Sequence, residues 1–317
     1  MLKNIGKTLL FFAVFLVLFL GLSNIFVPKN NLEEAGIHNA RGKGFLGEAP
    51  QSLDVLFVGD SEAYCSFVPL RIWDRQGITS YVCADGDQMI YQCFSFVERI
   101  FENQSPKIVV LETNTLYRPF SVADMLGHHS QELLPYLRYH DRWKNLQPED
   151  LGGKVEFTGT VRDRGYYYRT ETSHTDTAGY MAPSEEVDPV PMMSQVYVNQ
   201  ILTLCEEKGA RLILVSVPSP TNWSSYYHNG VEAMAQELGV TYIDLNLMSE
   251  EVPIDWNCES FDSGDHLNYD GAVKVSDYLG KYLWDTGKFQ DKRGMEQYGH
   301  WQEDLEAFYK EIDNMAQ

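Results

Sequence analysis

The sequence predicts an α/β protein in which a parallel β-sheet lies between two layers of helices. Short apolar runs rich in β-branched residues alternate with longer amphipathic stretches along most of the chain, and this alternation is typical of parallel sheets covered on both faces. Glycine or proline follows most of these segments, where a helix or strand has to stop. A chain of 317 residues with 44% hydrophobic residues can bury the core that such a fold requires.

The first part of the chain predicts a membrane anchor. Residues 8–27 form an almost uninterrupted apolar run of about 20 residues, which is long enough to cross a hydrocarbon core. Lys3 and Lys7 precede this run, so the positive-inside rule places the N-terminus in the cytoplasm. We therefore expect residues 1–27 to be the cytoplasmic tip and transmembrane anchor of a single-pass cell-membrane protein whose remainder is extracytoplasmic. The alternative is a cleaved secretory signal, which would leave the protein secreted, but the run lacks a good small-x-small cleavage site.

Regular structure is expected after a linker at residues 28–50, which has mixed charge and no periodicity. The predicted strands are buried apolar runs at residues 53–58, 79–83, 107–112, 211–217 and 240–245. The predicted helices are at residues 68–76, 88–103, 192–208, 227–238 and 271–283. Together these segments define a domain over residues 51–290. The alternation breaks at about residues 117–191, which we interpret as an insertion or lid after the third strand, and residues 291–317 predict an acidic C-terminal helix.

Composition excludes some classes of function. The formal net charge of −20 disfavours nucleic-acid binding, because neutralising phosphates requires a basic surface. None of the five cysteines has CxxC spacing, and His128, His129 and His174 lack metal-ligand spacing. We therefore expect no metal site and no organic cofactor.

Four segments contain side chains suited to chemistry. Sites in open parallel sheets form at the carboxyl ends of the strands. Ser61 follows the first predicted strand, Gly86 lies near the end of the second, and Asn114 follows the third. His266 precedes the helix predicted at residues 271–283. A hydroxyl, a glycine amide, a side-chain amide and an imidazole are thus expected to face one crevice.

These segments occur in an order that resembles the SGNH (GDSL-like) hydrolase superfamily: a serine in a strand-terminal Gly-Asp-Ser turn, a glycine, an asparagine and a late Asp/His segment. The resemblance covers residues 53–285 and implies a three-layer α/β/α, flavodoxin-like fold. By position it implies that Ser61 is the nucleophile and His266 the base. It also implies that the amides of Ser61 and Gly86 and the side chain of Asn114 are the oxyanion donors. Residues 266–272 are similar to those of extracytoplasmic members, some of which acylate or deacylate cell-envelope polysaccharides.

The chain departs from the family pattern near each of these residues. Glu62 stands where the name-giving motif has leucine, and the Asn114 segment lacks the usual Gly-x-Asn-Asp. The usual acid lies three residues before the histidine, where this chain has Ser263. Asp262 and Asp265 both remain candidates for the acid. We favour Asp262, because a tight Ser-Gly turn can bring it round to the histidine, whereas an adjacent Asp265 points away if the segment is extended.

The predicted chemistry explains these residue types. A serine hydroxyl becomes a good nucleophile only when a neighbouring base takes its proton, and a histidine titrates near neutral pH and can return that proton to the leaving group. Fixed donors must stabilise the tetrahedral oxyanion, at roughly 3–4 kcal/mol each. A carboxylate must hold the imidazole tautomer.

We therefore expect an extracytoplasmic serine esterase or O-acyltransferase acting on acyl, most simply acetyl, esters of a cell-envelope polysaccharide. Transfer would require an acyl donor delivered across the membrane by a polytopic membrane partner. His140 and Arg142, in an aromatic part of the insertion, are candidate substrate contacts, with a structural role as the rival interpretation. The alternative class is a non-catalytic envelope scaffold or binding protein with a degenerate site. A phosphodiesterase is disfavoured, because the sequence has no metal-ligand pattern.

Overall fold

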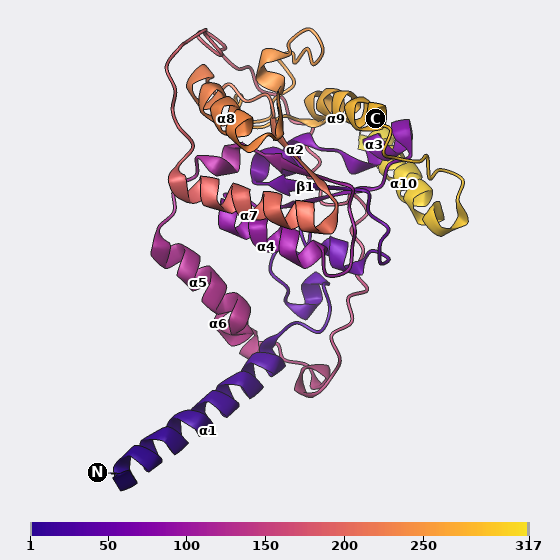
Figure 1. Cartoon of the computed structure of the whole chain (residues 1–317). Helices are drawn as coiled ribbons and strands as arrows, with labels where there is room; N and C mark the ends of the chain where they lie inside the picture. Colours follow the sequence, from indigo (N-terminus) through magenta and orange to yellow (C-terminus); the bar gives the residue numbers. More distant parts are fainter. Residues whose placement is uncertain (1, 316–317) are drawn as a thin grey trace. The chain divides into compact units, whose positions relative to one another are not determined.

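The computed structural model describes residues 2–315 and contains a five-stranded parallel sheet (Figure 1). The strands are β1 (Val55–Gly59), β2 (Ser80–Ala84), β3 (Ile108–Glu112), β4 (Arg211–Ser216) and β5 (Thr241–Asp244). Their order across the sheet is β2-β1-β3-β4-β5, and each neighbouring pair is parallel. The predicted fold class is confirmed, and the five predicted strands are present with small shifts at their ends.

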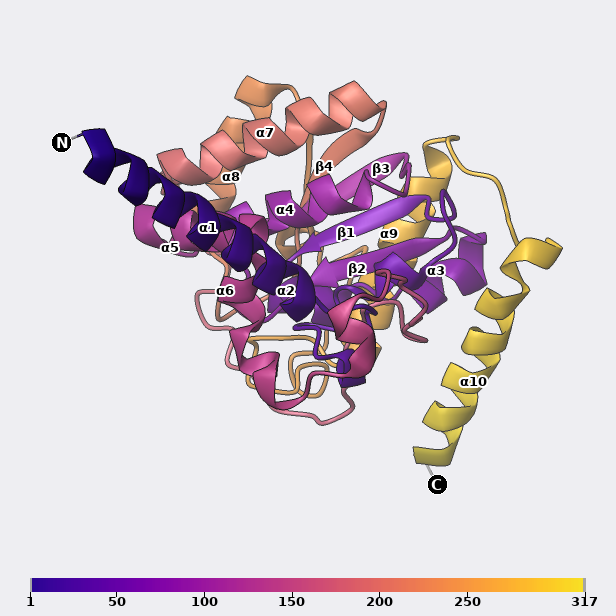
Figure 2. The ribbon, with the colours of Figure 1, turned by 90° about the horizontal axis from the view of Figure 1, so that it is seen from below.

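Helices cover both faces of this sheet (Figures 1 and 2). They are α2 (Ser61–Ser66), α3 (Pro69–Gln76), α4 (Ile90–Ile100), α7 (Met192–Lys208), α8 (Ser225–Leu238), α9 (Tyr269–Asp285) and α10 (Gly299–Met315). Helices α2 and α3 pack against α9 on one face, α4 packs against α7 on the other, and α8 lies along β5. Gly77, Gly209 and Gly239 end α3, α7 and α8 in the left-handed conformation, as the sequence predicts.

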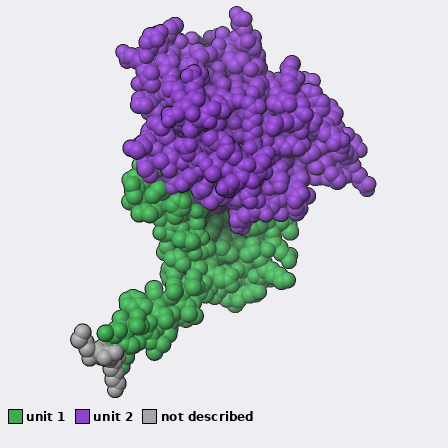
Figure 3. Space-filling view, viewed as in Figure 1, with its two compact units in different colours: residues 1–40, 120–159 green, residues 41–119, 160–317 purple. Residues whose placement is uncertain are grey.

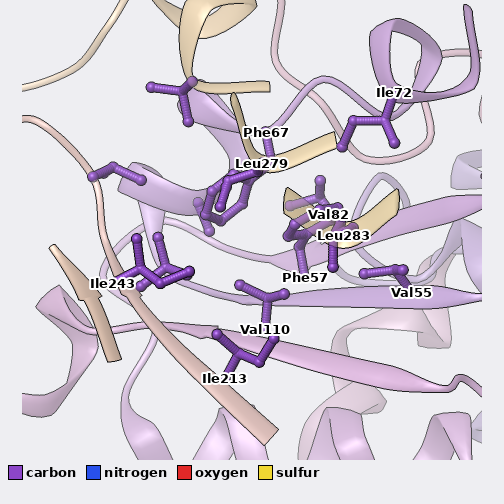
Figure 4. Packing of buried hydrophobic residues seen from close by; sticks show 14 of the residues in the cluster. Val55, Phe57, Phe67, Ile72, Val82, Val110, Ile213, Ile243, Leu279 and Leu283 are labelled. Carbon is purple, nitrogen blue, oxygen red and sulfur yellow. The ribbon is translucent and has the colours of Figure 1, made fainter. Parts of the chain in front are cut away.

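The core lies between the sheet and these helices. Successive side chains of a strand point to opposite faces, so Phe57, Val110 and Ile213 share one face and meet Leu279 of α9 (Figure 4). Every residue of β1, β2 and β3 is buried. This burial on both faces explains why the strands are continuous apolar runs rather than alternating patterns.

The chain divides into two compact units (Figure 3). The anchor unit consists of residues 1–40 and 120–159, and the sheet unit consists of residues 41–119 and 160–317. The anchor unit contains the helices α1 (Leu2–Phe26), α5 (Val122–Leu133) and α6 (Pro135–Tyr139). The segment interpreted from the sequence as one insertion is therefore divided between the two units, because residues 120–159 belong to the anchor unit and the residues from 160 onward belong to the sheet unit. There the Arg164 carbonyl accepts a hydrogen bond from the Val82 amide at 2.9 Å.

The C-terminal helix is part of the sheet unit's core. Trp301 is buried, and the fully buried guanidinium of Arg164 lies over its ring at 4.4 Å. The same guanidinium pairs with Glu48 at 3.1 Å and with Asp304 at 2.6 Å. A buried charge needs such partners, so α10 supplies both packing and charge compensation to a segment far away in the sequence.

Candidate active site

Ser61 is the first residue of α2, directly after β1. The sequence predicts only a tight turn here; the structure instead forms a six-residue helix, capped by Asp60, whose side chain accepts a hydrogen bond from the Glu62 amide at 2.9 Å. The preceding Gly59 has to be glycine, because a Cβ there would meet the Cβ of Glu112 at 2.7 Å. Ser61 retains 8% of its surface exposed. The strand, the glycine and the cap together fix the position of the hydroxyl.

His266 is held by Asp262. The Nδ1 atom of His266 lies 2.6 Å from Oδ2 of Asp262, and the His266 amide donates to Oδ1 of the same carboxylate at 2.7 Å. Ser263 and Gly264 have φ angles of 64° and 90°, so two successive left-handed residues turn the chain back on itself. This is the tight Ser-Gly turn that the sequence suggests. Phe261 stacks on the imidazole, with ring centroids 5.5 Å apart.

Asp265 has a different position. Its carboxylate lies 3.7 Å from Nδ1 of His266, beyond hydrogen-bonding distance, and accepts a hydrogen bond from the side-chain amide of Asn222. A neutral His266 that donates from Nδ1 to Asp262 carries its lone pair on Nε2. The geometry therefore favours Asp262 over Asp265 as the acid that sets the tautomer.

One amide joins the segments of Ser61 and His266. Asn222, in the loop after β4, donates to Glu62 at 2.7 Å and also to Asp265. Glu62 follows Ser61 in the chain, and Asp265 precedes His266. The two segments that the sequence places about 200 residues apart are thus linked at the carboxyl end of the sheet, as the rule for parallel sheets predicts.

The Nε2 atom of His266 is inaccessible to solvent and has no hydrogen-bond partner among the described residues. Ser61 and His266 are therefore not hydrogen-bonded in this structure. Buried polar atoms are nearly always paired, so an unpaired ring nitrogen requires an explanation. Catalytic hydrogen bonds are often open in free enzymes and close when substrate binds.

The predicted oxyanion donors have other partners here. The Gly86 amide donates to the side chain of Asp85 at 2.9 Å in an exposed loop. Gly86 does not adopt a left-handed conformation; its neighbour Asp87 does, with a φ of 53°. The side chain of Asn114 donates to Oδ2 of Asp60 at 3.0 Å. Asn114 therefore lies beside the residue that precedes Ser61, and its bond to Asp60 uses one of the two hydrogens of its side-chain amide.

Three carboxylates are buried in the neighbourhood of Ser61: Asp60, Glu62 and Glu112. Burial raises the pKa of Glu62 well above its ordinary value, and the charge of Asp60 raises it further. Burial and then the charges of Asp60 and Glu62 raise the pKa of Glu112 in the same way. Arg118 partly compensates this negative charge, since its Nε atom donates to Asp60.

Sequence reasoning missed Glu112, Arg118 and Asn222. Glu112 is an acid at the end of an otherwise apolar strand, and this pattern in the sequence indicates a buried carboxylate at the edge of the site. Asn222 lies in the loop after the fourth strand, so the rule that selected the other segments could also have selected it. Arg118 has no such signal, because only the fold brings it to Asp60.

We expect Glu112→Gln to raise the free energy of unfolding, by on the order of 1 kcal/mol at neutral pH. Folding raises the pKa of Glu112 above its ordinary value of 4.5, so above about pH 4.5 the unfolded wild type releases a proton that the folded state retains. Wild-type stability therefore falls as the pH rises from there towards the folded pKa, whereas glutamine carries no such proton. Glutamine can still accept from the Asn114 amide, as Oε1 of Glu112 does at 3.0 Å.

Urea unfolding in detergent at about pH 5 and about pH 8 measures this difference. The gain should be larger at the higher pH. Glu237, which is exposed on α8, is the matched control, and Glu237→Gln should change little at either pH. An equal gain for Glu112→Gln at both pH values would contradict the explanation.

A depression of about 500 Å³ borders Asn222. It is lined by Glu186, Val187, Asp188, Thr221, Asn222, Trp223, Ser224, Tyr226 and Tyr227. Its wall is rigid, because Tyr227 stacks on Tyr117 with ring centroids 4.0 Å apart and Trp223 donates from its indole to Asp244 at 3.0 Å. Tyr226 is 44% exposed, so its ring is available for contact. Aromatic faces with carboxylates, hydroxyls and an amide suit a polar ligand with apolar faces.

His140 and Arg142 belong to the anchor unit. The buried guanidinium of Arg142 donates to the Phe26 carbonyl at 2.6 Å and to Asp150 at 2.9 Å. The Nδ1 atom of His140 lies 3.2 Å from the Leu137 carbonyl. These contacts give Arg142 a structural role, and a substrate role for either residue stays a prediction that they do not support.

A cation has one candidate position at the site. Oxygen and nitrogen atoms of Asp262, Asp265 and His266 lie within 4.8 Å of one another. The same atoms already make the hydrogen bond between His266 and Asp262, so a cation would have to replace that proton. The donor set fits the histidine–acid pair better than a metal centre.

The resemblance to SGNH hydrolases implies a serine after the first strand, a histidine–acid pair before a late helix, and a flavodoxin-like sheet. The structure places Ser61 after β1 and the His266–Asp262 pair before α9, in a sheet of order β2-β1-β3-β4-β5. No family model matches the chain, and no curated protein matches its sequence. Among solved structures, it is similar to a GDSL-like lipase from Bacteroides thetaiotaomicron, with a TM-score of 0.37, 11% identity, and 80% of this chain and 95% of that chain covered. It is also similar to the psychrotrophic esterase EstA from Pseudoalteromonas sp., with a TM-score of 0.40, 9% identity, and 74% and 99% covered. A Bacteroides fragilis structure described as an acylhydrolase has a TM-score of 0.39, 13% identity, and 78% and 95% covered.

Proposed function

We propose that the chain is a serine-dependent esterase or O-acyltransferase of the SGNH type, acting on acyl esters of cell-envelope glycans. The observation that carries this proposal is the His266–Asp262 pair on the same rim of the sheet as Ser61, because the buried Nε2 atom of His266 has no hydrogen-bond partner in the described part of the chain. Such a nitrogen is suited to take a proton from an alcohol once substrate brings the two together. The proposed reaction uses side chains and backbone amides of the chain together with the acyl acceptor.

In the proposed reaction the Ser61 oxygen attacks the acyl carbonyl carbon while its proton passes to Nε2 of His266. The imidazolium is stabilised by Asp262, which keeps its negative charge. The carbonyl electrons move to oxygen, and the Ser61 amide with Asn114 or Gly86 stabilises that charge. The intermediate collapses, the C–O bond to the leaving alcohol breaks, and His266 returns the proton to that alcohol. The acyl group then remains on Ser61 and passes to water or to a sugar hydroxyl by the reverse steps.

The depression beside Asn222 supports a carbohydrate as the alcohol part of the ester. A pyranose has apolar faces that pack on aromatic rings and hydroxyls that bond to carboxylates and amides, and this surface offers both. Asn222 also contacts the neighbours of Ser61 and His266, so a sugar seated there would lie next to the reacting groups.

We expect Tyr226→Ala to raise KM for an acetylated oligosaccharide about tenfold, because an aromatic contact of this kind contributes about 1.4 kcal/mol. The kcat/KM for p-nitrophenyl acetate, which has no sugar, should stay within about twofold. Trp284, on α9 and 40% exposed, is the matched control aromatic outside the depression. Equal losses on both substrates would mean that Tyr226 supports the fold rather than a sugar.

Hydrolysis and transfer are distinguished by the acceptor. Incubating the full chain in detergent with p-nitrophenyl acetate, with and without acceptor oligosaccharide, measures both activities. Acetylated oligosaccharide among the products identifies a transferase, which in the cell would require an acyl donor delivered by a polytopic membrane partner. Free acetate alone identifies an esterase.

The anchor unit supports retention of the N-terminal helix. The segment Asn4–Phe26 is apolar and long enough to span a membrane, with a mean hydropathy of 2.6. Its last turns are integrated into the unit, since Ser23 and Phe26 are buried and Arg142 bonds to the Phe26 carbonyl. Cleavage as a signal would remove these contacts, so we propose an uncleaved, single-pass anchor with the sheet unit outside the cytoplasm. Intact-mass measurement of the mature chain from membranes tests this.

A non-catalytic scaffold is the second candidate. Two observations favour it. Ser61 and His266 are not hydrogen-bonded to each other, and the amides of Asn114 and Gly86 donate to carboxylates of the chain. Labelling the folded chain with a fluorophosphonate probe separates the two candidates. An adduct on Ser61 supports the enzyme, and its absence supports the scaffold.

A further inference from the structure

Part of the anchor unit packs against the apolar helix α1. The ring of Tyr136, in α6, contacts Phe26 with centroids 5.0 Å apart and Phe19 with centroids 5.4 Å apart. The amide of Tyr136 also donates to the Ser23 hydroxyl at 3.4 Å. These contacts lie inside the stretch of α1 that is long and apolar enough to span a membrane.

The depth of these contacts follows from helix geometry. Phe19 lies seven residues before Phe26, and a helix rises 1.5 Å per residue, so Phe19 lies about 10 Å deeper along the axis. If the end of α1 marks the membrane surface, a ring in contact with Phe19 lies at the boundary of headgroups and acyl chains. Elements that lie in this boundary are buried there by about 5–10 Å. Helix α6 therefore cannot stay entirely in water.

The side chains around Tyr136 suit that position. Leu133, Leu137 and Trp143 are 79%, 40% and 63% exposed. Three large apolar side chains are thus exposed within eleven residues of the chain, and exposed apolar surface of this kind is typical of an interaction site. Tyrosine and tryptophan are also the residues enriched at membrane–water interfaces.

The charges near these residues point to insertion rather than electrostatic attraction. Lys144 lies over the Trp143 ring at 5.3 Å, and such long cationic side chains can reach headgroup phosphates. Arg142 is paired with Asp150, Arg138 lies over the Tyr139 ring at 5.9 Å, and the exposed Asp141 offsets part of the positive charge of Arg138 and Lys144. Anionic lipid is therefore not required.

We propose that residues 133–143 form a second membrane contact, lying in the interface beside α1 with Leu133, Leu137 and Trp143 among the lipids. The proposal rests on the proposed anchoring by α1. The occupant of this surface is lipid; a helix of another membrane protein would be the alternative, and a purified chain in lipid vesicles excludes it.

The test uses the full chain in phosphatidylcholine vesicles whose lipids carry bromine, a quencher of tryptophan, either near the headgroup or near the chain end. Trp143→Phe isolates the signal of Trp143, because the other five tryptophans all belong to the sheet unit. We expect the Trp143 component to lose about half of its fluorescence, more with the shallow bromine than with the deep one. Leu137→Asp should reduce that quenching at least about twofold, since a carboxylate opposes insertion.

A second variant separates this proposal from the anchoring on which it rests. Phe15→Trp, made in the Trp143→Phe background, places an indole near the middle of α1. Deep bromine should quench it most. If this indole is quenched and Trp143 is not, the interface contact is wrong and the anchor stands. If the indole at position 15 is not quenched, the anchor fails and the proposal fails with it.

Discussion

Ser61→Ala is expected to reduce ester turnover by roughly 10⁴-fold or more, because no other group can form the acyl intermediate. The free energy of unfolding should change by less than about 1 kcal/mol, since the Ser61 hydroxyl makes no hydrogen bond within residues 2–315. Hydrolysis of p-nitrophenyl acetate and fluorophosphonate labelling measure the loss, and thermal unfolding in detergent measures the stability.

Ser66→Ala is the matched control for this variant. Ser66 ends the same short helix, is buried, and its hydroxyl has no hydrogen-bond partner among the described residues. It should retain wild-type turnover. If Ser61→Ala retains its activity, the proposed mechanism is wrong. If Ser61→Ala unfolds, Ser61 has a structural role. A chelator should leave the wild type unaffected; loss of activity would instead favour a cation at Asp262, Asp265 and His266.

Asp262→Asn should lower kcat by about 10³–10⁴-fold, whereas Asp265→Asn should cost less than about tenfold. Asp262 lies 2.6 Å from Nδ1 of His266, and in the proposed mechanism its charge stabilises the imidazolium that forms when Ser61 loses its proton. An asparagine there removes the charge and can hold the wrong tautomer. Asp265 is 3.7 Å from the ring, and an asparagine in its place can still accept from Asn222.

The comparison of the two variants is its own control, because the acids are three residues apart on one turn. Steady-state kinetics over a range of pH measures both. A reversed order of effects would assign Asp265 as the acid and would require the turn at Ser263 and Gly264 to rearrange in the substrate complex.

Much of the sheet unit could be predicted from the sequence, because its local signals agree with its fold. Strands β1, β2 and β3 are apolar runs that are buried on both faces, and glycines end several helices in the left-handed conformation that they adopt easily. Helix α2 could not be predicted in this way. A Gly-Asp-Ser sequence usually marks a turn, and only the capping by Asp60 and the burial of the following residues extend it into a helix.

The division of the segment after β3 could not be predicted, because it depends on contacts between distant parts of the chain. Residues 120–159 join residues 1–40 through interactions such as the bond from Arg142 to the Phe26 carbonyl. No periodicity within either segment encodes that pairing. The same reason explains the missed Arg118, whose position is defined by Asp60, 58 residues earlier in the chain.

One part of the candidate site could be predicted from the sequence, namely the turn that precedes His266. The turn at Ser263 and Gly264 is readable from the sequence, and it brings Asp262 to His266. The hydrogen-bond partners of Asn114 and Gly86 could not be predicted from the sequence, because they depend on which carboxylates lie nearby in the fold.

The bridge made by Asn222 has a consequence for how this protein varies among its relatives. One side-chain amide offers two hydrogens, and both go to acids that come from different parts of the chain. A substitution of Asn222 removes the donor of both acids, and a substitution that removes either acceptor leaves one hydrogen of the amide unpaired, so such changes should be tolerated best in combination. In a deep set of homologous sequences, positions 62, 222 and 265 are thus expected to covary as a triplet, even in lineages where the surrounding loops have diverged.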